Sequence, residues 1–184
     1  MKYNKTVILK NKKECVIRNA DFADAEEVYA NFNLTHAQSE YLLSYPDENS
    51  FTVSQESEFL KKKTESKNEI ELCAVVDGKI VGTAGIEEVG SKDKVKHRAE
   101  FGISVEKAYQ GIGVGRALTE ACIECAEKAG FAQLELEAVS ENEKALSLYK
   151  SVGFTEYGRN PKGFFSREKK YQELVLMRLE LKKI

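Results

Sequence analysis

The most constraining stretch of this sequence is a strand-like run that leads through a glycine-rich turn directly into an amphipathic helix. The run covers residues 99–105, and the turn carries Gly111, Gly113 and Gly115 at alternate positions. Glycine has no Cβ atom, so a ligand can approach this backbone closely. The first N–H groups of the following helix have no intrahelical partner, and the helix dipole puts partial positive charge there. The stretch therefore predicts an anion site of the kind that binds a phosphate or pyrophosphate.

Two common phosphate motifs do not fit this spacing. A Walker loop needs Gly-x-x-x-x-Gly-Lys-Ser/Thr, and no Lys-Ser or Lys-Thr follows these glycines. A dinucleotide fingerprint needs Gly-x-Gly-x-x-Gly, but Arg116 and Leu118 stand where its third glycine would be. What is left is the pattern Gln110-x-x-Gly113-x-Gly115. A single glycine-rich loop is a weak signal, so the rest of the chain has to agree with it.

Length and charge narrow the class of protein. With 184 residues the chain can close one core, and we expect a single domain. A net charge of −2 argues against a general nucleic-acid binder, which carries a basic excess. No apolar run is long enough to span a bilayer, and residues 1–10 hold only three consecutive apolar residues, too few for a signal-peptide core. We therefore expect no nucleic-acid partner, no membrane association and a cytoplasmic location.

The cysteines allow two interpretations. Cys122-x-x-Cys125 has the spacing of a metal or redox motif. There is no second cysteine pair, however, and His36 and His97 lie far away in the sequence. Both cysteines also fall on the apolar stripe of the helix that follows the glycine turn. We therefore predict core cysteines, and we predict no metal site.

Hydrophobic periodicity predicts alternating strands and helices in one α/β or α+β domain. Apolar runs on both sides of Asp77-Gly78 predict a hairpin over residues 71–86. Residues 99–105 and 133–139 read as strands, and Gly130 closes the helix after the glycine turn. The other expected elements are a hairpin or strand at 7–17, a helix capped by Asp21, helices at 37–44 and 54–67, a helix from a capping box at 140–143 to Gly153, and a strand pair, 154–158 and 171–181, around a long basic loop.

Three local patterns resemble the GNAT superfamily of acetyl-CoA-dependent N-acetyltransferases. The strand with its Gln110-x-x-Gly113-x-Gly115 loop is similar to the family's Gln/Arg-x-x-Gly-x-Gly/Ala pyrophosphate loop. Residues 142–154 resemble the signature Asn-x-x-Ala-x-x-Leu-Tyr-x-x-x-Gly-Phe. Residues 16–25, Val-Ile-Arg-Asn-Ala-Asp-Phe-Ala-Asp-Ala, resemble the family's usual start. Each pattern alone is modest, but together and in this order they are a strong signal.

The resemblance implies a fold and an activity. We expect a single-domain GNAT fold, with a mixed, mostly antiparallel central sheet flanked by helices. The N-acetyltransferase domain is expected over residues 15–184, with a strand-like extension at 1–14. Acetyl-CoA is implied as co-substrate, without a metal. The implied enzyme moves an acetyl group by direct transfer to a primary amine of a small molecule or of a peptide or protein N-terminus. A homodimer is left open.

The resemblance also implies how acetyl-CoA is bound. Ile103 and Val105 offer main-chain groups to the pantetheine arm as a further strand would, and the Val105 N–H is the candidate for the oxyanion. Asn142 hydrogen-bonds the arm from the far side, although Asn is also a favoured helix cap. Gln110 shapes the turn. The residues whose backbone is expected to hold the pyrophosphate are Gly111, Ile112, Gly113, Val114, Gly115 and Arg116.

Two side chains are candidates for proton transfer. Tyr149 stands where the family often has a general acid, and a phenol with a pKa of about 10 suits a departing thiolate. Glu100, near the start of the central strand, is our candidate to take the amine's proton, directly or through water. Each has an alternative, because Tyr149 lies on an apolar helical stripe that could be core and Glu100 could simply face solvent. His97 is expected to be a loop residue rather than a base.

The acceptor is the least constrained part of the function. Residues 159–170 hold five basic residues and one acidic residue. In the family that this chain resembles, the segment between the last two strands borders the acceptor pocket. Positive charge there would favour an acceptor with a carboxylate or a phosphate, whereas a solvated loop would carry no such preference. Two other functions stay open, a non-catalytic CoA-binding sensor or regulatory domain and a nucleotide-binding module.

Overall fold

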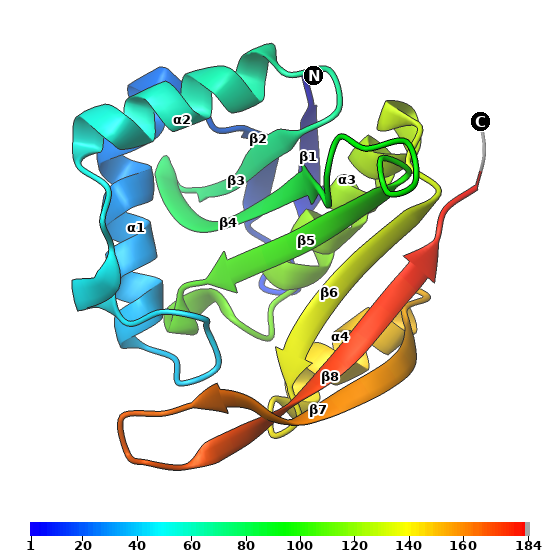
Figure 1. The fold of residues 1–184 in the computed structure, drawn as a ribbon. Helices are drawn as coiled ribbons and strands as arrows, with labels where there is room; N and C mark the ends of the chain where they lie inside the picture. Colours follow the sequence, from blue (N-terminus) through cyan, green and yellow to red (C-terminus); the bar gives the residue numbers. More distant parts are fainter. Residues whose placement is uncertain (183–184) are drawn as a thin grey trace.

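The computed structural model describes residues 1–182 and contains one eight-stranded sheet in the order β1-β2-β3-β4-β5-β6-β8-β7 (Figure 1). Neighbouring strands are antiparallel except β5 and β6, which are parallel. The expected α/β class with a mixed, mostly antiparallel sheet is confirmed. The strands are β1 (Asn4–Ile8), β2 (Glu14–Asn19), β3 (Ile70–Val76), β4 (Lys79–Glu88), β5 (Arg98–Val105), β6 (Gln133–Val139), β7 (Thr155–Phe165) and β8 (Tyr171–Glu180).

Helices cover both faces of the sheet. One face carries α1 and α2, and the other carries α3 and α4 (Figure 1). Three short 3-10 turns connect the elements. No helix within residues 1–182 combines the length and the apolar character that crossing a membrane requires. The helical elements are η1 (Phe22–Asp24), α1 (Ala25–Ala37), η2 (Pro46–Glu48), α2 (Val53–Glu65), η3 (Lys107–Tyr109), α3 (Val114–Ala129) and α4 (Glu143–Ser151).

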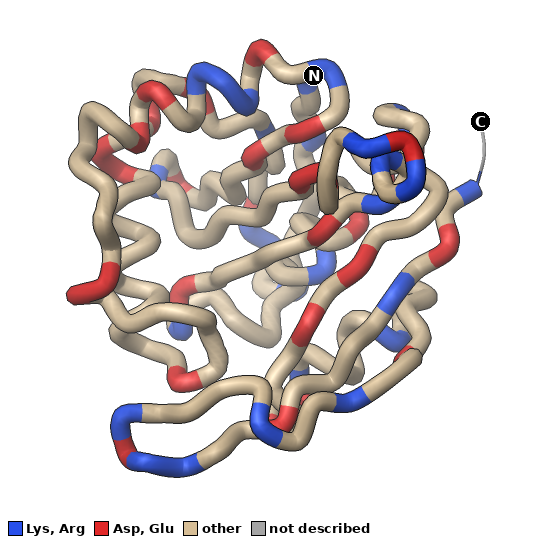
Figure 2. Tube along the Cα trace, in the orientation of Figure 1, with Lys and Arg blue, Asp and Glu red and all other residues tan. Residues whose placement is uncertain are grey.

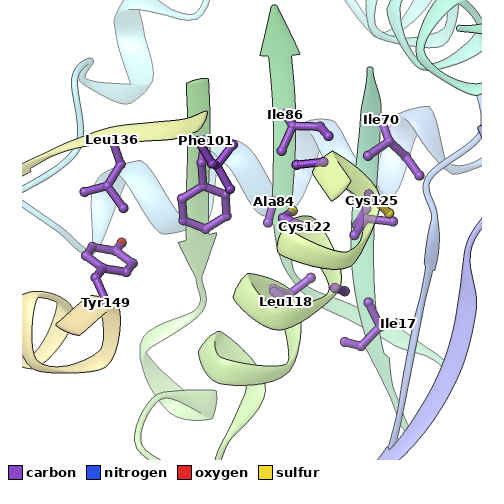
Figure 3. Packing of buried hydrophobic residues seen from close by; sticks show 14 of the residues in the cluster. Ile17, Ile70, Ala84, Ile86, Phe101, Leu118, Cys122, Cys125, Leu136 and Tyr149 are labelled. Carbon is purple, nitrogen blue, oxygen red and sulfur yellow. The ribbon is translucent and has the colours of Figure 1, made fainter. Parts of the chain in front are cut away.

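The larger core lies between the sheet and α3. Leu118, Cys122 and Cys125 step by three and four along α3, so they share one face of the helix. They pack against Ile86 of β4 and other side chains of the sheet (Figure 3). Both cysteines are fully buried and are not joined in a disulfide. The expectation of core cysteines is confirmed.

The β3–β4 hairpin turns where the sequence predicts it. Asp77 and Gly78 have φ angles of 52° and 79°, the two positive values that a type I′ turn requires. The N-terminal hairpin forms as well, with β1 and β2 paired from Asn4 opposite Arg18 to Ile8 opposite Glu14. Asp21 caps a helical turn, because its Oδ1 accepts from the Ala23 N–H at 2.8 Å. That turn is η1, which leads into α1.

Two expected local features are wrong. There is no helix at 37–44: α1 continues to Ala37, and the segment after it turns, with Leu43 82% exposed. So short a segment does not recover the cost of helix nucleation without a buried face. The capping box expected at 140–143 does not form from Ser140, whereas the expectation that Asn142 is a helix cap is confirmed, since the Asn142 Oδ1 accepts from the Ala145 N–H at 3.3 Å.

The loop between the last two strands is also shorter than the sequence predicts. β7 continues to Phe165, so the connection to β8 covers only residues 166–170. The register shifts between Asn160 and Phe164, around Pro161 and Gly163. Proline and glycine favour a loop in a sequence, but β7 is an edge strand of the sheet, where a bulge accommodates both.

Candidate functional site

The central feature of the site is an opening between the two parallel strands. β5 and β6 are paired only over three positions, from Arg98 opposite Gln133 to Glu100 opposite Glu135. Beyond these, β5 stays paired with β4 as far as Val105, while β6 follows β8 (Figure 1). The two strands therefore diverge after Glu100, and the edge of β5 that faces β6 is left without a strand partner.

The backbone of β5 presents Ile103 and Val105 to this opening. The Glu106 N–H donates to the Val81 carbonyl at 2.9 Å, which fixes the side of β5 that bonds to β4. Because main-chain groups alternate along a strand, those of Val105 and Ile103 point the other way, toward the opening. The Gln110 side-chain amide donates to the Val105 carbonyl at 3.0 Å and so ties the following loop to the end of the strand.

The glycine loop leads into the free end of α3. Gly111 and Gly113 have φ angles of 77° and 112°, a region that favours glycine. Gly113 is the N-cap of α3, and the first bond that closes a helical turn runs from the Ala117 N–H to the Gly113 carbonyl at 3.0 Å. The N–H groups of the first turn therefore point out of the helix end, where the dipole is positive. The Ile112 carbonyl is held by the Lys10 N–H at 2.9 Å.

Gly115 and Arg116 connect the loop to α4. A Cβ atom at Gly115 would lie 3.5 Å from Leu148 Cδ2, an ordinary contact, so no positive φ or clash requires glycine there. The Arg116 guanidinium donates to Ser151 Oγ at 2.7 Å and to Glu120 Oε1 at 3.3 Å. Its side chain is thus engaged between the helices, while its backbone N–H lies in the first turn of α3 together with that of Val114.

Tyr149 of α4 lies beneath the opening. Its ring meets the Phe101 ring edge to face at a centroid distance of 6.1 Å and also contacts Phe154 at 6.0 Å. Figure 3 shows it extending from α4 toward the strands that carry Phe101 and Leu136. Burial raises the pKa of Tyr149 to about 12, so the phenol keeps its proton at neutral pH. The residue belongs to the core and borders the opening at once.

Glu100 lies on the opposite face of the sheet from Tyr149. Phe101 points toward α3 and α4, so its neighbour Glu100 points to the other face, where it is exposed. There it stands between Glu87 on β4 and Glu135 on β6, and Glu135 is paired with Arg98. Acidic positions recur along β5 and β6 (Figure 2). The two expected proton-transfer residues are therefore separated by the sheet.

One cluster escaped the sequence analysis. On α1, Thr35 and His36 are buried, and the Thr35 hydroxyl donates to Ser104 Oγ of β5 at 3.2 Å. Ser104 stands between Ile103 and Val105. The signal that could have revealed this cluster is a pair of polar residues on the buried stripe of an otherwise amphipathic helix. No pattern in the sequence shows, however, that the stripe meets β5.

The basic residues between 159 and 170 are largely neutralised by neighbours. Arg159 pairs with Glu156 at 2.7 Å and with Glu173 at 2.6 Å, and Arg167 pairs with Asp47 at 2.8 Å. At the tip of the β7–β8 hairpin, basic residues lie beside an acidic one (Figure 2). The positive field that would have favoured an anionic acceptor is therefore much weaker than the composition of the segment implies.

The buried thiols are poor nucleophiles. Burial raises the pKa of Cys15 and of Cys125 to about 11, and it raises that of Cys122 well above its ordinary value. Among residues 1–182, no three His, Cys, Asp or Glu side chains gather in a way that could hold a metal ion.

The sequence model of the acetyltransferase (GNAT) family matches residues 32–154, so the chain belongs to this family. Among its relatives is the L-amino acid N-acetyltransferase AaaT of Escherichia coli (strain K12), 30% identical over 152 residues, which are 81% of this chain and 88% of AaaT. Three other relatives match over a segment only. The chain spans 22% of the length of an uncharacterized protein of Mycobacterium leprae, 49% of the N-alpha-acetyltransferase RimI of Mycobacterium tuberculosis and 38% of a [ribosomal protein bS18]-alanine N-acetyltransferase of Escherichia coli.

Solved structures have the same fold. An acetyltransferase of the GNAT family from Streptococcus pneumoniae is 30% identical and has a TM-score of 0.87, over 91% of this chain and 99% of that chain. The yncA structure from Salmonella typhimurium, solved with its cofactor acetyl-CoA, is 22% identical with a TM-score of 0.82, over 92% and 95% of the two chains. At that identity the second likeness shows the fold alone.

Proposed function

We propose that this protein is an acetyl-CoA-dependent N-acetyltransferase that acts by direct transfer to a primary amine, of a small molecule or of a peptide or protein N-terminus. The observation that carries the proposal is the unpaired edge of β5 that runs into the positive end of α3. A pantetheine arm has amide groups that a strand edge can bond, and its pyrophosphate needs N–H donors at one end of that edge. A neighbour with the same fold binds acetyl-CoA.

We assign the pyrophosphate to the backbone of residues 111–116 and the pantetheine arm to Ile103 and Val105. The Val105 N–H then meets the oxyanion that forms on the thioester carbonyl. Gln110 keeps its bond to the Val105 carbonyl and holds the loop in place. Asn142 reaches the arm through its amide nitrogen, because its Oδ1 is already bound to the helix end.

The proposed step forms a C–N bond and breaks a C–S bond. The amine nitrogen attacks the thioester carbonyl, and the tetrahedral intermediate collapses with loss of the CoA thiolate. Tyr149 donates its proton to that thiolate. The phenol is still protonated at neutral pH and therefore has the proton to give. We also propose Glu100 as a proton acceptor for the amine. It acts through water and lies on the other face of the sheet from Tyr149, so the two side chains do not exchange protons directly.

No protein acyl group is needed in this proposal. All four cysteines are buried, and the thiols of α3 pack in the core rather than at the loop. Mass spectrometry after incubation with acetyl-CoA alone is expected to show no acetyl-cysteine. A chemically competent acetyl-cysteine adduct would replace direct transfer by a two-step mechanism. A cytoplasmic location, a homodimer and the absence of a metal requirement stay predictions.

The decisive experiment measures thiol release from acetyl-CoA with a panel of L-amino acids, an alanyl tripeptide, spermidine and kanamycin. We expect at least one acceptor to release CoA, and Gly113→Glu to abolish both release and calorimetric CoA binding, through bulk and negative charge. A non-catalytic sensor would instead bind CoA with no release for any amine. A nucleotide-binding module would let ATP or NAD displace CoA, whereas we expect neither to do so.

A further inference from the structure

We propose that His36 of α1 takes the first of the two protons that the acceptor ammonium loses, directly or through one water molecule. This inference rests on the proposed function and adds a catalytic residue that lies outside every motif in the sequence. Four observations support it: the contact of α1 with β5, the hydrogen bond of the imidazole, the side of α1 on which it lies and the absence of charged neighbours.

The first observation is that α1 meets β5 at the divergence of the strands. The Thr35 hydroxyl donates to Ser104 Oγ at 3.2 Å. Ser104 is flanked by Ile103 and Val105, whose main-chain groups face the opening. The residue that follows Thr35 on α1 is His36, so the imidazole is carried by the part of the helix that is pinned to the strand edge proposed for the thioester.

The second observation is the hydrogen bond that fixes the tautomer of His36. Its Nδ1 lies 2.8 Å from the Phe32 carbonyl. A carbonyl only accepts, so Nδ1 carries the hydrogen and Nε2 carries the free lone pair. The imidazole also stacks on the Phe32 ring, with centroids 3.7 Å apart and planes at 22°. The ring is therefore held in one orientation, with its basic nitrogen away from the helix backbone.

The third observation concerns the sides of α1. At 100° per residue, Glu27 and Gln38 share one side of the helix, and His36 lies on the opposite side. The first side contacts the ends of the strands, because Glu27 accepts from the Ile80 N–H at 2.6 Å and Gln38 from the Lys107 N–H at 2.8 Å. His36 thus lies on the side away from those strand ends, over the face of the sheet that carries Glu100.

The fourth observation is that nothing charged competes for His36. Burial lowers its pKa, and the Phe32 carbonyl opposes this shift only in part. Within residues 1–182 the imidazole lies within hydrogen-bond distance only of the Phe32 carbonyl and the Thr35 hydroxyl, and it forms no ion pair. A neutral imidazole is ready to accept a proton.

Each proton of the proposed step has a destination. The acceptor enters as an ammonium ion, and Nε2 of His36 takes one proton and becomes imidazolium. The neutral nitrogen attacks the thioester, and the amide that forms loses a second proton, which passes through water to Glu100 in the role proposed above. One of the two protons replaces the one that Tyr149 gives to the CoA sulfur, and the other is released to water. No oxidant, reductant or further reactant is required.

The test uses His36→Asn, because an Asn amide can keep the bond to the Phe32 carbonyl while it removes the basic nitrogen. We expect kcat to fall by about 10²–10⁴-fold with the best acceptor of the amine panel, and calorimetric CoA affinity to stay unchanged. In the wild type, kcat/KM should decrease toward low pH as His36 becomes protonated, with a midpoint below the ordinary His pKa of about 6.5. The variant should lose this acid limb. Imidazole added to His36→Ala should restore part of the rate.

The matched control is Thr35→Val, which removes the hydroxyl contact with Ser104 and keeps the imidazole. It is expected to retain the acid limb of the pH profile. A wild-type rate and pH profile in His36→Asn would overturn the proposal. If the wild type acetylated no amine at all, the proposed function would fail. The protonation state of His36 would then be tested separately by ¹⁵N NMR. An imidazolium, or an Nε2–H tautomer, at pH 7 would reject His36 as the base.

Discussion

The rings of Tyr149 and Phe101 meet edge to face, with their centroids 6.1 Å apart and their planes at 87°. Phe101 is the first residue of β5 beyond the three pairs that join it to β6. The contact therefore holds a phenol of the last helix directly under the point where the central strands separate. An edge-to-face pair of this kind restricts the ring to one orientation, which a proton donor needs.

Tyr149→Phe is expected to keep this aromatic contact and to lose the proton. We expect kcat to fall by about 10²–10⁴-fold with unchanged CoA affinity, the effect of removing one positioned acid. Steady-state kinetics and calorimetry on the same protein measure both. Tyr157→Phe is the control, because Tyr157 is 48% exposed on β7, and it should behave as wild type. Normal turnover of Tyr149→Phe would make Tyr149 a packing residue and leave the CoA site intact.

Gly113→Ala separates the effect of the backbone on stability from its effect on CoA binding. Its φ of 112° disfavours any side chain, so we expect the free energy of unfolding to fall by about 1–2 kcal/mol. Gly78→Ala, at φ 79° in the β3–β4 turn, is the matched control and should have a similar cost. Only the Gly113 variant should lose affinity for CoA. Equal CoA affinities in the two variants would remove the loop from the binding site.

Glu135→Gln probes the seam between β5 and β6. Both oxygens of Glu135 accept from the Arg98 guanidinium, and this hydrogen-bonded pair lowers the pKa of the carboxyl. The folded state gains stability from it above the ordinary Glu pKa of about 4.3 and loses that stability as the pH falls. We expect the variant to be destabilised by about 1–2 kcal/mol at pH 7 and much less at pH 3.

Urea unfolding at the two pH values measures this difference. Glu168→Gln serves as control, since the Glu168–Lys170 pair is exposed at the hairpin tip and should contribute nothing measurable. A Glu135→Gln variant with the same loss at both pH values would contradict the ion-pair explanation.

Glu71→Gln is expected to change the pH dependence of stability in the opposite sense. Burial raises the pKa of Glu71 to about 8, and its carboxylate lies over Gly85, where a Cβ atom would collide with it. A raised pKa means that the folded state binds the proton more tightly, so stability is full below the ordinary pKa and declines as the pH rises toward 8. The glutamine variant should lose this decline.

Thermal unfolding between pH 5 and pH 9 tests this prediction. Glu58→Gln is the control. Glu58 is exposed on α2, the helix that packs against β3, the strand of Glu71. It should keep the wild-type decline. If Glu71→Gln retained the decline as well, another group would have to be responsible.

Elements with strong local signals could be predicted from the sequence. The β3–β4 hairpin is specified by Asp77 and Gly78, and α3 by its stripe of apolar residues and by Gly130 at its end. The predictions were wrong for segments whose structure depends on partners far away in the sequence. Residues 37–44 lack a buried face of their own, and β7 reads as a loop because Pro161 is tolerated only where the strand is an edge.

The site divides in the same way. The glycine loop, Gln110 and Asn142 are local features, and their positions in the turn and at the helix cap follow from the sequence pattern. The pairing of Thr35 with Ser104 joins residues 69 positions apart, so no local pattern contains it. The ion pairs that neutralise Arg159 and Arg167 involve β8 and the 46–48 turn, and composition alone suggested a positive surface.

The short seam between β5 and β6 has a consequence for cooperativity. Three residue pairs join a five-stranded half of the sheet to a three-stranded half, while every other junction between neighbouring strands of the sheet is longer. The amides of Ile103 and Val105 have no strand across from them and are expected to exchange with deuterium quickly. A ligand that lay along this edge would act as the missing strand, slow that exchange and make the two halves unfold as one unit.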